Sequence, residues 1–207
     1  SPEDMMARFA KWLAEGHWTP HGEVFDVGIV CHKAVNRYRR GEPQENWGGA
    51  GERDNGNGSL MRILPLSIYS SFRQNRIVIE RSFAASALTH AHIRAKICCA
   101  IYSLIIKSII EGAKLEEAMR YASVAISTYV PDDEKEIFAP ILTGELLQRK
   151  RSEIQSTGYV LHCLEASLWC CHNFPTFEEA VLAAVNLGYD TDTTGAVTGG
   201  LAGVLYG

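Results

Sequence analysis

Residues 186–207 read NLGYDTDTTGAVTGGLAGVLYG, and this stretch sets the expected architecture. Gly188 is typical of a helix end, and Gly195, Gly199 and Gly203 then recur every four residues. This spacing predicts a final helix over about 194–206 with one bare face, after a short loop at 189–193. Glycine inside a helix costs about 1 kcal/mol relative to alanine, so close packing must offset that cost. We therefore expect this helix to be central.

The rest of the chain shows the same helical spacing of apolar residues. Ser1 and Pro2 open a first helix that ends at Gly16, and a second covers Val27 to Arg40. Further helices are predicted at about 60–72, 76–88, 93–111, 115–127, 157–172 and 177–187. No stretch alternates apolar and polar residues long enough to indicate a strand. The predicted fold class is all-α.

Composition limits the possible partners. The 207 residues are 46% hydrophobic and 21% charged, which fits one domain over residues 1–207. The net charge of -4 and the lack of a long basic block argue against nucleic-acid binding. The longest apolar stretch, 97–106, is about half of a bilayer span, and no signal-peptide pattern opens the chain. We expect no membrane association and a cytoplasmic location.

The six cysteines are expected to be free thiols. Cys98-Cys99 and Cys170-Cys171 are adjacent pairs inside apolar helical patterns. No C-x-x-C spacing typical of a zinc or redox site occurs. Free cysteine behaves as a small hydrophobic residue in reducing compartments, so burial explains these positions.

Residues 190–194 place two carboxylates and three hydroxyls side by side. Asp190, Asp192 and a threonine beside them are hard oxygen ligands, which suit Mg²⁺ or Mn²⁺ better than zinc. Helix capping is the simpler alternative, because an N-cap aspartate or threonine needs no metal. A cap uses one oxygen donor, however, and five neighbouring residues offer them here. The surplus favours a binding site.

The segment Gln44–Arg62 departs from the helical pattern. It is rich in glycine and asparagine, and Gly58-Ser59 leads directly into an expected helix. Backbone N–H groups of such a loop can form an anion-binding nest at a positive helix end. A flexible surface loop is the alternative. The segment matches neither the P-loop nor the dinucleotide-binding fingerprint.

Four stretches together resemble the ADP-ribosylglycohydrolases, including the dinitrogenase-reductase-activating glycohydrolases. They are GYDTDTTGAVTGGLAG, NGNGSLMRILPLSIY, SALTH and STGYVLHCLEASLWC, and the likeness covers nearly the whole chain. The resemblance implies an orthogonal all-α bundle holding two Mg²⁺ or Mn²⁺ ions. It also implies a metal-dependent hydrolase that removes ADP-ribose from protein side chains or related adducts. ADP-ribose or an ADP-ribosylated protein is then the expected partner.

The resemblance also assigns roles to single residues. Asp190, Asp192 and Thr193 would be metal ligands. The loop residues Asn57, Gly58 and Ser59 would face the phosphates. His90 would belong to the substrate pocket and Tyr159 would lie near the distal ribose. From the residues alone, His90 could equally complete a helix end and Tyr159 could be a packed tyrosine.

One family feature has no counterpart here. Members begin with a segment carrying an acidic residue and a Ser/Thr-Asp-Asp-Thr stretch that supplies further ligands, and neither is found in this sequence. We therefore expect a domain trimmed at both ends, with half the metal site, little activity, and a glycine face that has lost a packing partner. The catalytic residue stays unassigned. The alternatives are a non-enzymatic, crystallin-like or ADP-ribose-binding member of the fold and a ligand-free helical scaffold.

Overall fold

The computed structural model describes residues 1–207 and contains ten α-helices. The only β pairing consists of two isolated bridges, Gly49 with His90 and Gly56 with Tyr159, so the all-α prediction is confirmed. None of the helices combines the length and apolar character needed to cross a bilayer. The helices are α1 (Pro2–Glu15), α2 (Ile29–Arg39), α3 (Leu64–Ser70), α4 (Asn75–Ala87), α5 (Ile93–Ile110), α6 (Leu115–Ile126), α7 (Lys135–Thr143), α8 (Val160–Asn173), α9 (Phe177–Val185) and α10 (Thr191–Tyr206).

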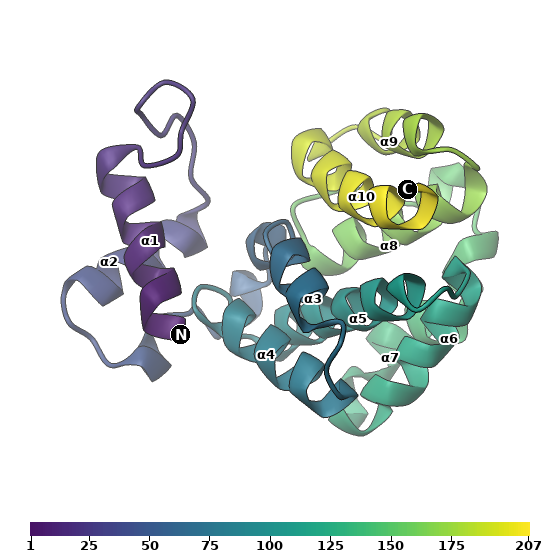
Figure 1. The fold of residues 1–207 in the computed structure, drawn as a ribbon, viewed down its shortest axis with the longest axis horizontal. Coiled ribbons are helices and arrows are strands. Elements are labelled where there is room, and N and C mark those ends of the chain that lie inside the picture. The colour runs from purple at the N-terminus through teal and green to yellow at the C-terminus, as the bar shows by residue number, and fades with distance from the viewer.

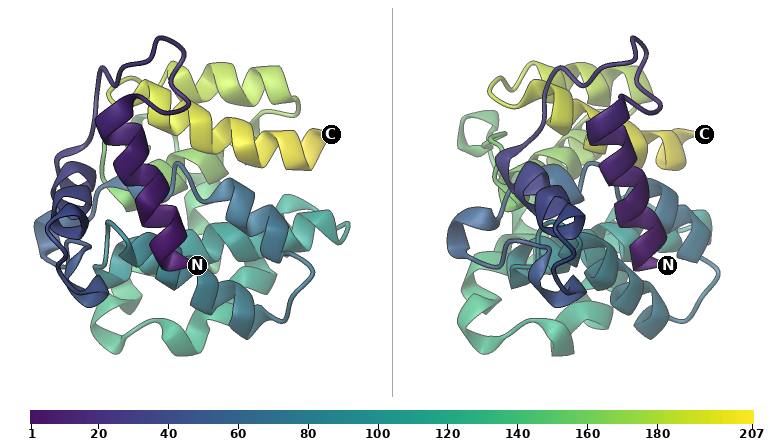
Figure 2. Two further views of the ribbon diagram at one scale, coloured as in Figure 1. Left: turned by 60° about the vertical axis from the view of Figure 1, so that its left-hand side comes forward. Right: turned by 90° about the vertical axis from the view of Figure 1, so that its left-hand side faces the viewer.

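The centre of the fold is α5, with α3, α4, α6, α8 and α10 packed around it (Figure 1). Residues 97–109 of α5 are all buried, because its sequence is apolar on nearly every side. The expectation that the last helix would be central is therefore wrong. α10 lies at one side of the body, beside α8 and α9 (Figure 2).

The glycine face of α10 packs against α9. A Cβ atom at Gly195 would lie 2.9 Å from Val185 Cγ1, and one at Gly199 would lie 3.7 Å from Val181 Cγ2. Close packing at the glycines is thus confirmed, since a side chain at Gly195 would push the helices apart. The expected loss of a packing partner is wrong, because α9 fills that place.

The α1–α2 region forms a smaller unit beside this body (Figure 1). It shares a five-residue hydrophobic cluster with the rest of the chain: Met6, Ala34, Val35, Trp47 and Leu88. Trp47 donates a hydrogen bond from Nε1 to the Glu42 carbonyl at 2.7 Å. The unit is therefore joined to the body through Trp47 and Leu88, close to the glycine-rich loop.

Several local expectations need adjustment. No helix was predicted where α7 lies, and this helix has nine residues and contains Pro140. α10 begins at Thr191 rather than 194, so Asp192 and Thr193 belong to its first turn and Asp190 is its N-cap residue. α2 begins at Ile29, which leaves Val27 outside the helix. All six cysteines are free, and five of them are buried, as the sequence predicted.

Candidate functional site

The segment 44–62 is tied by backbone hydrogen bonds to two distant parts of the chain. Gly49 donates to the Thr89 carbonyl at 2.9 Å and accepts from Ala91 at 2.7 Å. The Asn57 amide donates to the Gly158 carbonyl at 2.9 Å, and the Val160 amide donates to the Asn55 carbonyl at 3.0 Å. Within this frame the segment folds into three short 3₁₀ turns, which argues against a flexible surface loop.

The start of α10 joins the same assembly. The Asp190 amide donates to the Ser156 carbonyl at 3.0 Å, just before the segment that pairs with Asn57. The Asn57 side chain donates from Nδ2 to Asp190 Oδ2 at 2.7 Å, across 133 positions of sequence. Gly158 lies against the same oxygen, which would be 3.4 Å from a Cβ atom there. The structure thus brings together the predicted loop and the predicted metal ligands.

We call Asn57, Asp190, Asp192 and Thr193 the acidic wall. The Asp192 carboxyl hydrogen-bonds with the Asp190 carboxyl, and this contact together with the Thr193 N–H holds the pKa of Asp192 below its usual value. Asp192 is exposed, whereas Thr193 is buried. Two carboxyl groups in contact repel one another when both are ionised, so a cation beside them would stabilise this arrangement.

The donor chemistry of the acidic wall fits a hard divalent cation. Two carboxylates and a threonine hydroxyl are the oxygen donors that Mg²⁺ and Mn²⁺ prefer. The chain nowhere gathers three or more His, Cys, Asp or Glu side chains in metal-binding positions. The acidic wall therefore offers part of a coordination sphere, and water or other oxygen donors would have to complete it.

A second group of residues lies on the other side of Gly58. His90 is buried, and its Cε1 would be 3.0 Å from a Cβ atom at Gly58, while Cys31 Sγ would be 3.2 Å away. A larger residue at position 58 would be in tight contact with both groups, and they would have to move by a few tenths of an ångström. Glycine therefore lets the imidazole and the α2 thiol approach the backbone closely.

Arg62 holds this group in place through three hydrogen bonds. It donates from Nη1 to the Gly58 carbonyl at 2.6 Å and from Nη2 to the Thr89 hydroxyl at 2.7 Å and the Ala85 carbonyl at 3.2 Å. Its guanidinium also lies 5.1 Å from the ring centre of Phe9 in α1. We call Gly58, Arg62, Thr89 and His90 the histidine wall.

The histidine wall holds its imidazole uncharged. Burial lowers the pKa of His90 to about 3, and the positive charge of Arg62 acts in the same direction. Asp54 opposes the shift but is outweighed. The Thr89 hydroxyl lies 2.7 Å from Nδ1 of the ring. His90 is therefore a neutral hydrogen-bonding group at neutral pH.

Tyr159 and Arg94 lie at the edge of the site. Tyr159 is the N-cap residue of α8, and its hydroxyl accepts a hydrogen bond from Arg94 Nη1 at 3.4 Å. Arg94 also pairs with Glu134 at 2.6 Å and with Glu52 at 3.6 Å, and the Glu134 contact raises the pKa of the guanidinium. Burial raises the pKa of Tyr159. Both groups are thus held in place by charge-assisted contacts.

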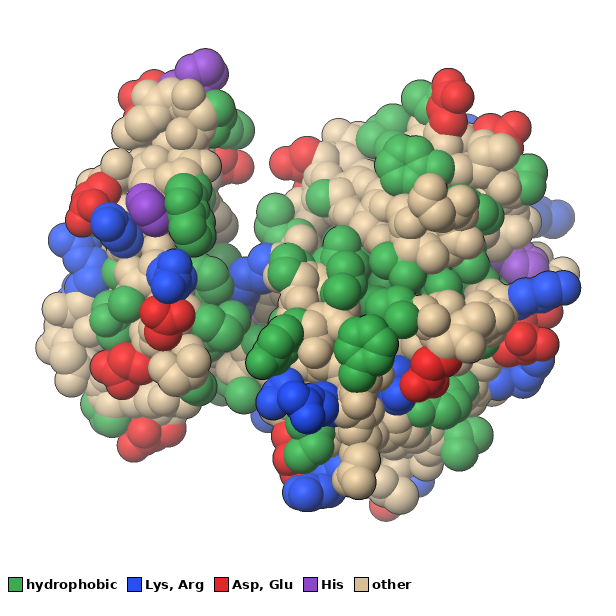
Figure 3. Space-filling view, in the orientation of Figure 1, with side chains coloured by type: hydrophobic (Ala, Val, Ile, Leu, Met, Phe, Trp, Pro, Cys, Tyr) green, Lys and Arg blue, Asp and Glu red, His purple; other side chains and the backbone are tan.

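A hollow of about 340 Å³ opens beside Tyr159, lined by Glu52, Arg53, Asn55, Gly56, Gly158 and Tyr159. The Asn55 Oδ1 atom in its wall is buried and accepts no hydrogen bond. A buried acceptor without a partner is costly, so a donor from a ligand would stabilise it. Figure 3 shows a groove between the α1–α2 unit and the body, where Phe9 and Cys31 approach the histidine wall.

Two predicted phosphate contacts are already occupied. Ser59 is fully buried, and its hydroxyl accepts a hydrogen bond from Ser86 at 3.0 Å. The Asn57 amide is bound to the Gly158 carbonyl. The N–H groups of Gly58 and Ser59 have no acceptor within the chain. Of these three predicted residues, only Gly58 combines an unpaired amide with partial exposure, because Ser59 is fully buried.

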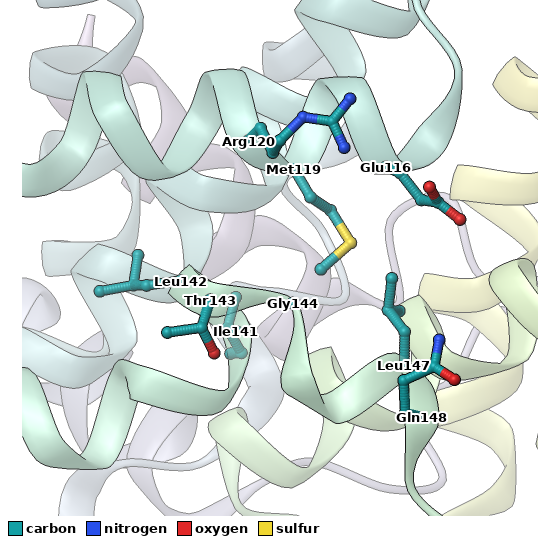
Figure 4. A pocket seen from close by; sticks show the side chains of 9 residues that line it. All are labelled: Glu116, Met119, Arg120, Ile141, Leu142, Thr143, Gly144, Leu147 and Gln148. Carbon is teal, nitrogen blue, oxygen red and sulfur yellow. The ribbon is translucent and has the colours of Figure 1, made fainter.

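A separate hollow of about 210 Å³ lies between α6, α7 and the following 3₁₀ turn (Figure 4). Met119 and Leu147 reach toward its centre, whereas Glu116 and Arg120 lie at its edge. It contains none of the predicted site residues. The polar side chains of the site therefore converge elsewhere, around the glycine-rich loop.

Sequence reasoning missed Arg62, Thr89, Arg94 and Asn55. Asn55, Arg62 and Thr89 lie within stretches that carry the family resemblance, so their positions could have pointed to the site. Their residue types could not, because an arginine beside a helix is usually exposed. Only the fold shows that Arg62 points inward and that Arg94 spans from Glu134 to Tyr159.

Comparisons with known proteins point to one family. A family model described as ADP-ribosylglycohydrolase matches residues 1–207. The ADP-ribosylarginine hydrolase Tri1 of Serratia proteamaculans (strain 568) is 31% identical over 205 residues, covering 97% of this chain and 52% of its own length. The ADP-ribosyl-[dinitrogen reductase] glycohydrolase of Rhodospirillum rubrum is 25% identical, covering 99% of this chain and 61% of its own length.

The fold has a solved counterpart. A chain described as an ADP-ribosylglycohydrolase-related protein complex superposes with a TM-score of 0.78 at 27% identity, covering 100% of this chain and 64% of that one. The present chain spans about half the length of the two Tri1 relatives that it matches, the second being 32% identical and from Pseudomonas putida (strain GB-1).

Proposed function

This chain belongs to the ADP-ribosylglycohydrolase family, and we propose that it forms the ADP-ribose site of a metal-dependent hydrolase. The observation that carries the proposal is the hydrogen bond from Asn57 to Asp190. It places the glycine-rich loop, the carboxylates of α10 and the buried His90 around one point. A family site of this kind holds a phosphate-bearing sugar beside a cation.

We assign the acidic wall to the cation. Asp190, Asp192 and Thr193 would hold Mg²⁺ or Mn²⁺, with Asn57 orienting the Asp190 carboxylate through Oδ2. A bound cation would supply positive charge that polarises ribose hydroxyls and lowers the pKa of a nearby water. The family binds two such ions, and the two carboxylates here account for part of that set.

We assign the pyrophosphate to the loop. The free N–H group of Gly58 and the neutral His90 would contact its oxygens. The adenosine side would extend toward Tyr159 and the hollow beside it. Arg94 keeps the Tyr159 hydroxyl in place for that contact.

The linkage we favour is ADP-ribosylarginine. Two relatives above 30% identity carry that substrate in their names. In the reaction the bond between the anomeric carbon and the guanidine nitrogen breaks, water supplies the new C–O bond, and a proton passes to the leaving nitrogen. The acidic wall offers no carboxyl beyond Asp190 and Asp192, and we assign neither as the catalytic base.

The test is release of ADP-ribose from an arginine-ADP-ribosylated protein in the presence of Mg²⁺ or Mn²⁺. Because the chain holds only part of the metal site, we expect slow release that depends on the metal and falls by about a hundredfold in Asp192→Asn. Arg76→Gln serves as a matched surface control, since Arg76 pairs only with exposed Glu80. Metal-independent release, or equal rates in Asp192→Asn, would contradict the proposal. Binding of ADP-ribose without any release would instead favour the non-enzymatic family role.

A further inference from the structure

One ring nitrogen of His90 has no partner. Nδ1 lies 2.7 Å from the Thr89 hydroxyl, whereas Nε2 makes no hydrogen bond within the chain and is not fully enclosed. Nε2 faces the glycine-rich loop, where a Cβ atom at Gly56 would be 3.3 Å away. The residue as a whole is only 2% exposed. A nearly buried polar atom thus points at Gly56 and Gly58, where the loop has no side chains.

The hydrogen bonds of Arg62 determine whether the Thr89 hydroxyl donates to His90 or accepts from it. Arginine donates and never accepts, so the contact from Nη2 uses a lone pair of the Thr89 oxygen. Thr89 lies beyond the end of α4, and its hydroxyl does not form the bond to the carbonyl four residues earlier that is usual for threonine in a helix. Its only hydrogen-bond partners are Arg62 and His90. The hydroxyl proton of Thr89 therefore has one acceptor within reach, Nδ1 of His90.

In the alternative tautomer the hydroxyl proton of Thr89 has no hydrogen-bond acceptor. If Nδ1 carried the proton, Thr89 would accept from both Arg62 and His90, and its own proton would have no acceptor. Thr89 is buried, and an unpaired buried donor is strongly disfavoured. We propose that Thr89, oriented by Arg62, is a positioning residue that fixes His90 as the Nε2–H tautomer and so aims a neutral hydrogen-bond donor at the bound ligand.

This arrangement specifies what His90 can recognise. A neutral Nε2–H donates one hydrogen bond and offers no acceptor, so its partner must supply a lone pair, and a group that can only donate, such as an ammonium, is excluded. Resting on the proposed function, that partner is a pyrophosphate oxygen of ADP-ribose. The donor adds no charge of its own, so His90 contributes a directed hydrogen bond and not electrostatic attraction.

Nitrogen NMR of the histidine rings tests the tautomer directly in the full 207-residue chain. Long-range ¹H–¹⁵N correlation separates a protonated from an unprotonated ring nitrogen, and His90→Gln assigns the His90 signals by their loss. We expect protonated Nε2 and unprotonated Nδ1 in the unsubstituted chain. Protonated Nδ1 there would overturn the proposal, and this holds whether or not any variant folds.

Two variants test the role of Thr89. Thr89→Val keeps the shape but removes the hydroxyl, so a substantial share of His90 should change to the Nδ1–H form. Thr89→Ser should retain the Nε2–H form. His162 is an internal control, because its Nδ1 lies 2.8 Å from a different hydroxyl, that of Thr157. Its spectrum should change in Thr157→Val and stay unchanged in Thr89→Val. An unchanged His90 tautomer in Thr89→Val would overturn the positioning role.

Titration with ADP-ribose separates this inference from the proposed function. We expect ADP-ribose to shift the His90 Nε2 signal and to bind about tenfold more weakly to Thr89→Val than to Thr89→Ser. Binding that leaves Nε2 unperturbed would overturn the donor role of His90. No calorimetric binding at all, with the expected tautomer present, would overturn the proposed function and leave the tautomer assignment standing.

Discussion

The histidine wall and the acidic wall meet at the same glycine-rich loop but are built differently. Arg62 satisfies three buried acceptors, including the Gly58 carbonyl, and its charge is shared among them. Asp190 and Asp192 instead bring two carboxyl groups together, with the amide of Asn57 as the side-chain donor. One wall is held together by hydrogen bonds within the chain and leaves a single ring nitrogen free, whereas the other needs positive charge from outside. The difference separates recognition, which is preformed, from the chemistry that depends on a cation.

The largest expected effect is on the histidine wall. Arg62→Met removes the donor for the Gly58 and Ala85 carbonyls and for Thr89, and should lower the free energy of unfolding by about 2–4 kcal/mol. Urea denaturation measures it. The matched control, Arg76→Met, removes an exposed arginine and should change stability by less than about 0.5 kcal/mol. Equal effects in the two variants would mean that Arg62 does not hold this wall together.

A second effect should appear in acid. The pKa of His90 is about 3 in the folded chain and about 6.5 when unfolded, so the unfolded state takes up a proton first as pH falls. The stability from a neutral His90 is thus complete above about pH 6.5 and is lost between that pH and about 3. The loss is at most about 1.4 kcal/mol per pH unit. His90→Gln should show a shallower decline in urea denaturation from about pH 7 to 4.5; parallel curves would contradict it.

The close approach at Gly58 predicts a smaller effect. Gly58→Ala forces a methyl group against His90 and Cys31, and should lower the free energy of unfolding by about 1–3 kcal/mol and weaken ADP-ribose binding. Gly28→Ala is the control, because no atom lies within 4 Å of a Cβ there. Thermal unfolding and calorimetry measure both quantities. Full ADP-ribose affinity in Gly58→Ala would separate the loop from the binding site.

The acidic wall should respond with the smallest change in metal-free stability. Asp192→Asn removes carboxylate repulsion but also a favourable charge in the first turn of α10, and these effects oppose one another. We expect a net change below about 1 kcal/mol without metal. The rise in melting temperature produced by Mn²⁺ should disappear in the same variant. An undiminished rise in Asp192→Asn would place the cation elsewhere.

Nine of the ten helices were predictable because their apolar spacing is local information. The exception is α7, a short helix that contains Pro140. The central position of α5 also had a signal, since residues 97–109 are apolar on nearly all sides, but the glycine pattern of α10 drew the prediction away from it. Close packing at glycine shows where helices touch and does not show which one is innermost.

The sequence predicted the motifs that form the site but not the hydrogen bonds that join them. Resemblance placed Asn57 and Asp190 in one site, and their hydrogen bond agrees with that. Whether the Ser59 hydroxyl faces a ligand or the core depends on Ser86, which lies 27 residues away. Arg62 likewise gains its role from Ala85 in α4 and from Thr89 just after that helix. Such contacts arise from tertiary packing, which no local pattern in the sequence specifies.

The most direct test of the two-wall account is calorimetric titration of ADP-ribose into the chain with Mn²⁺ and, separately, with a chelator. A preformed histidine wall predicts measurable binding in both, and a cation-dependent acidic wall predicts affinity at least about tenfold higher with Mn²⁺. Equal affinity under the two conditions would contradict the account, because the carboxylates of Asp190 and Asp192 would then take no part in holding the ligand through a metal.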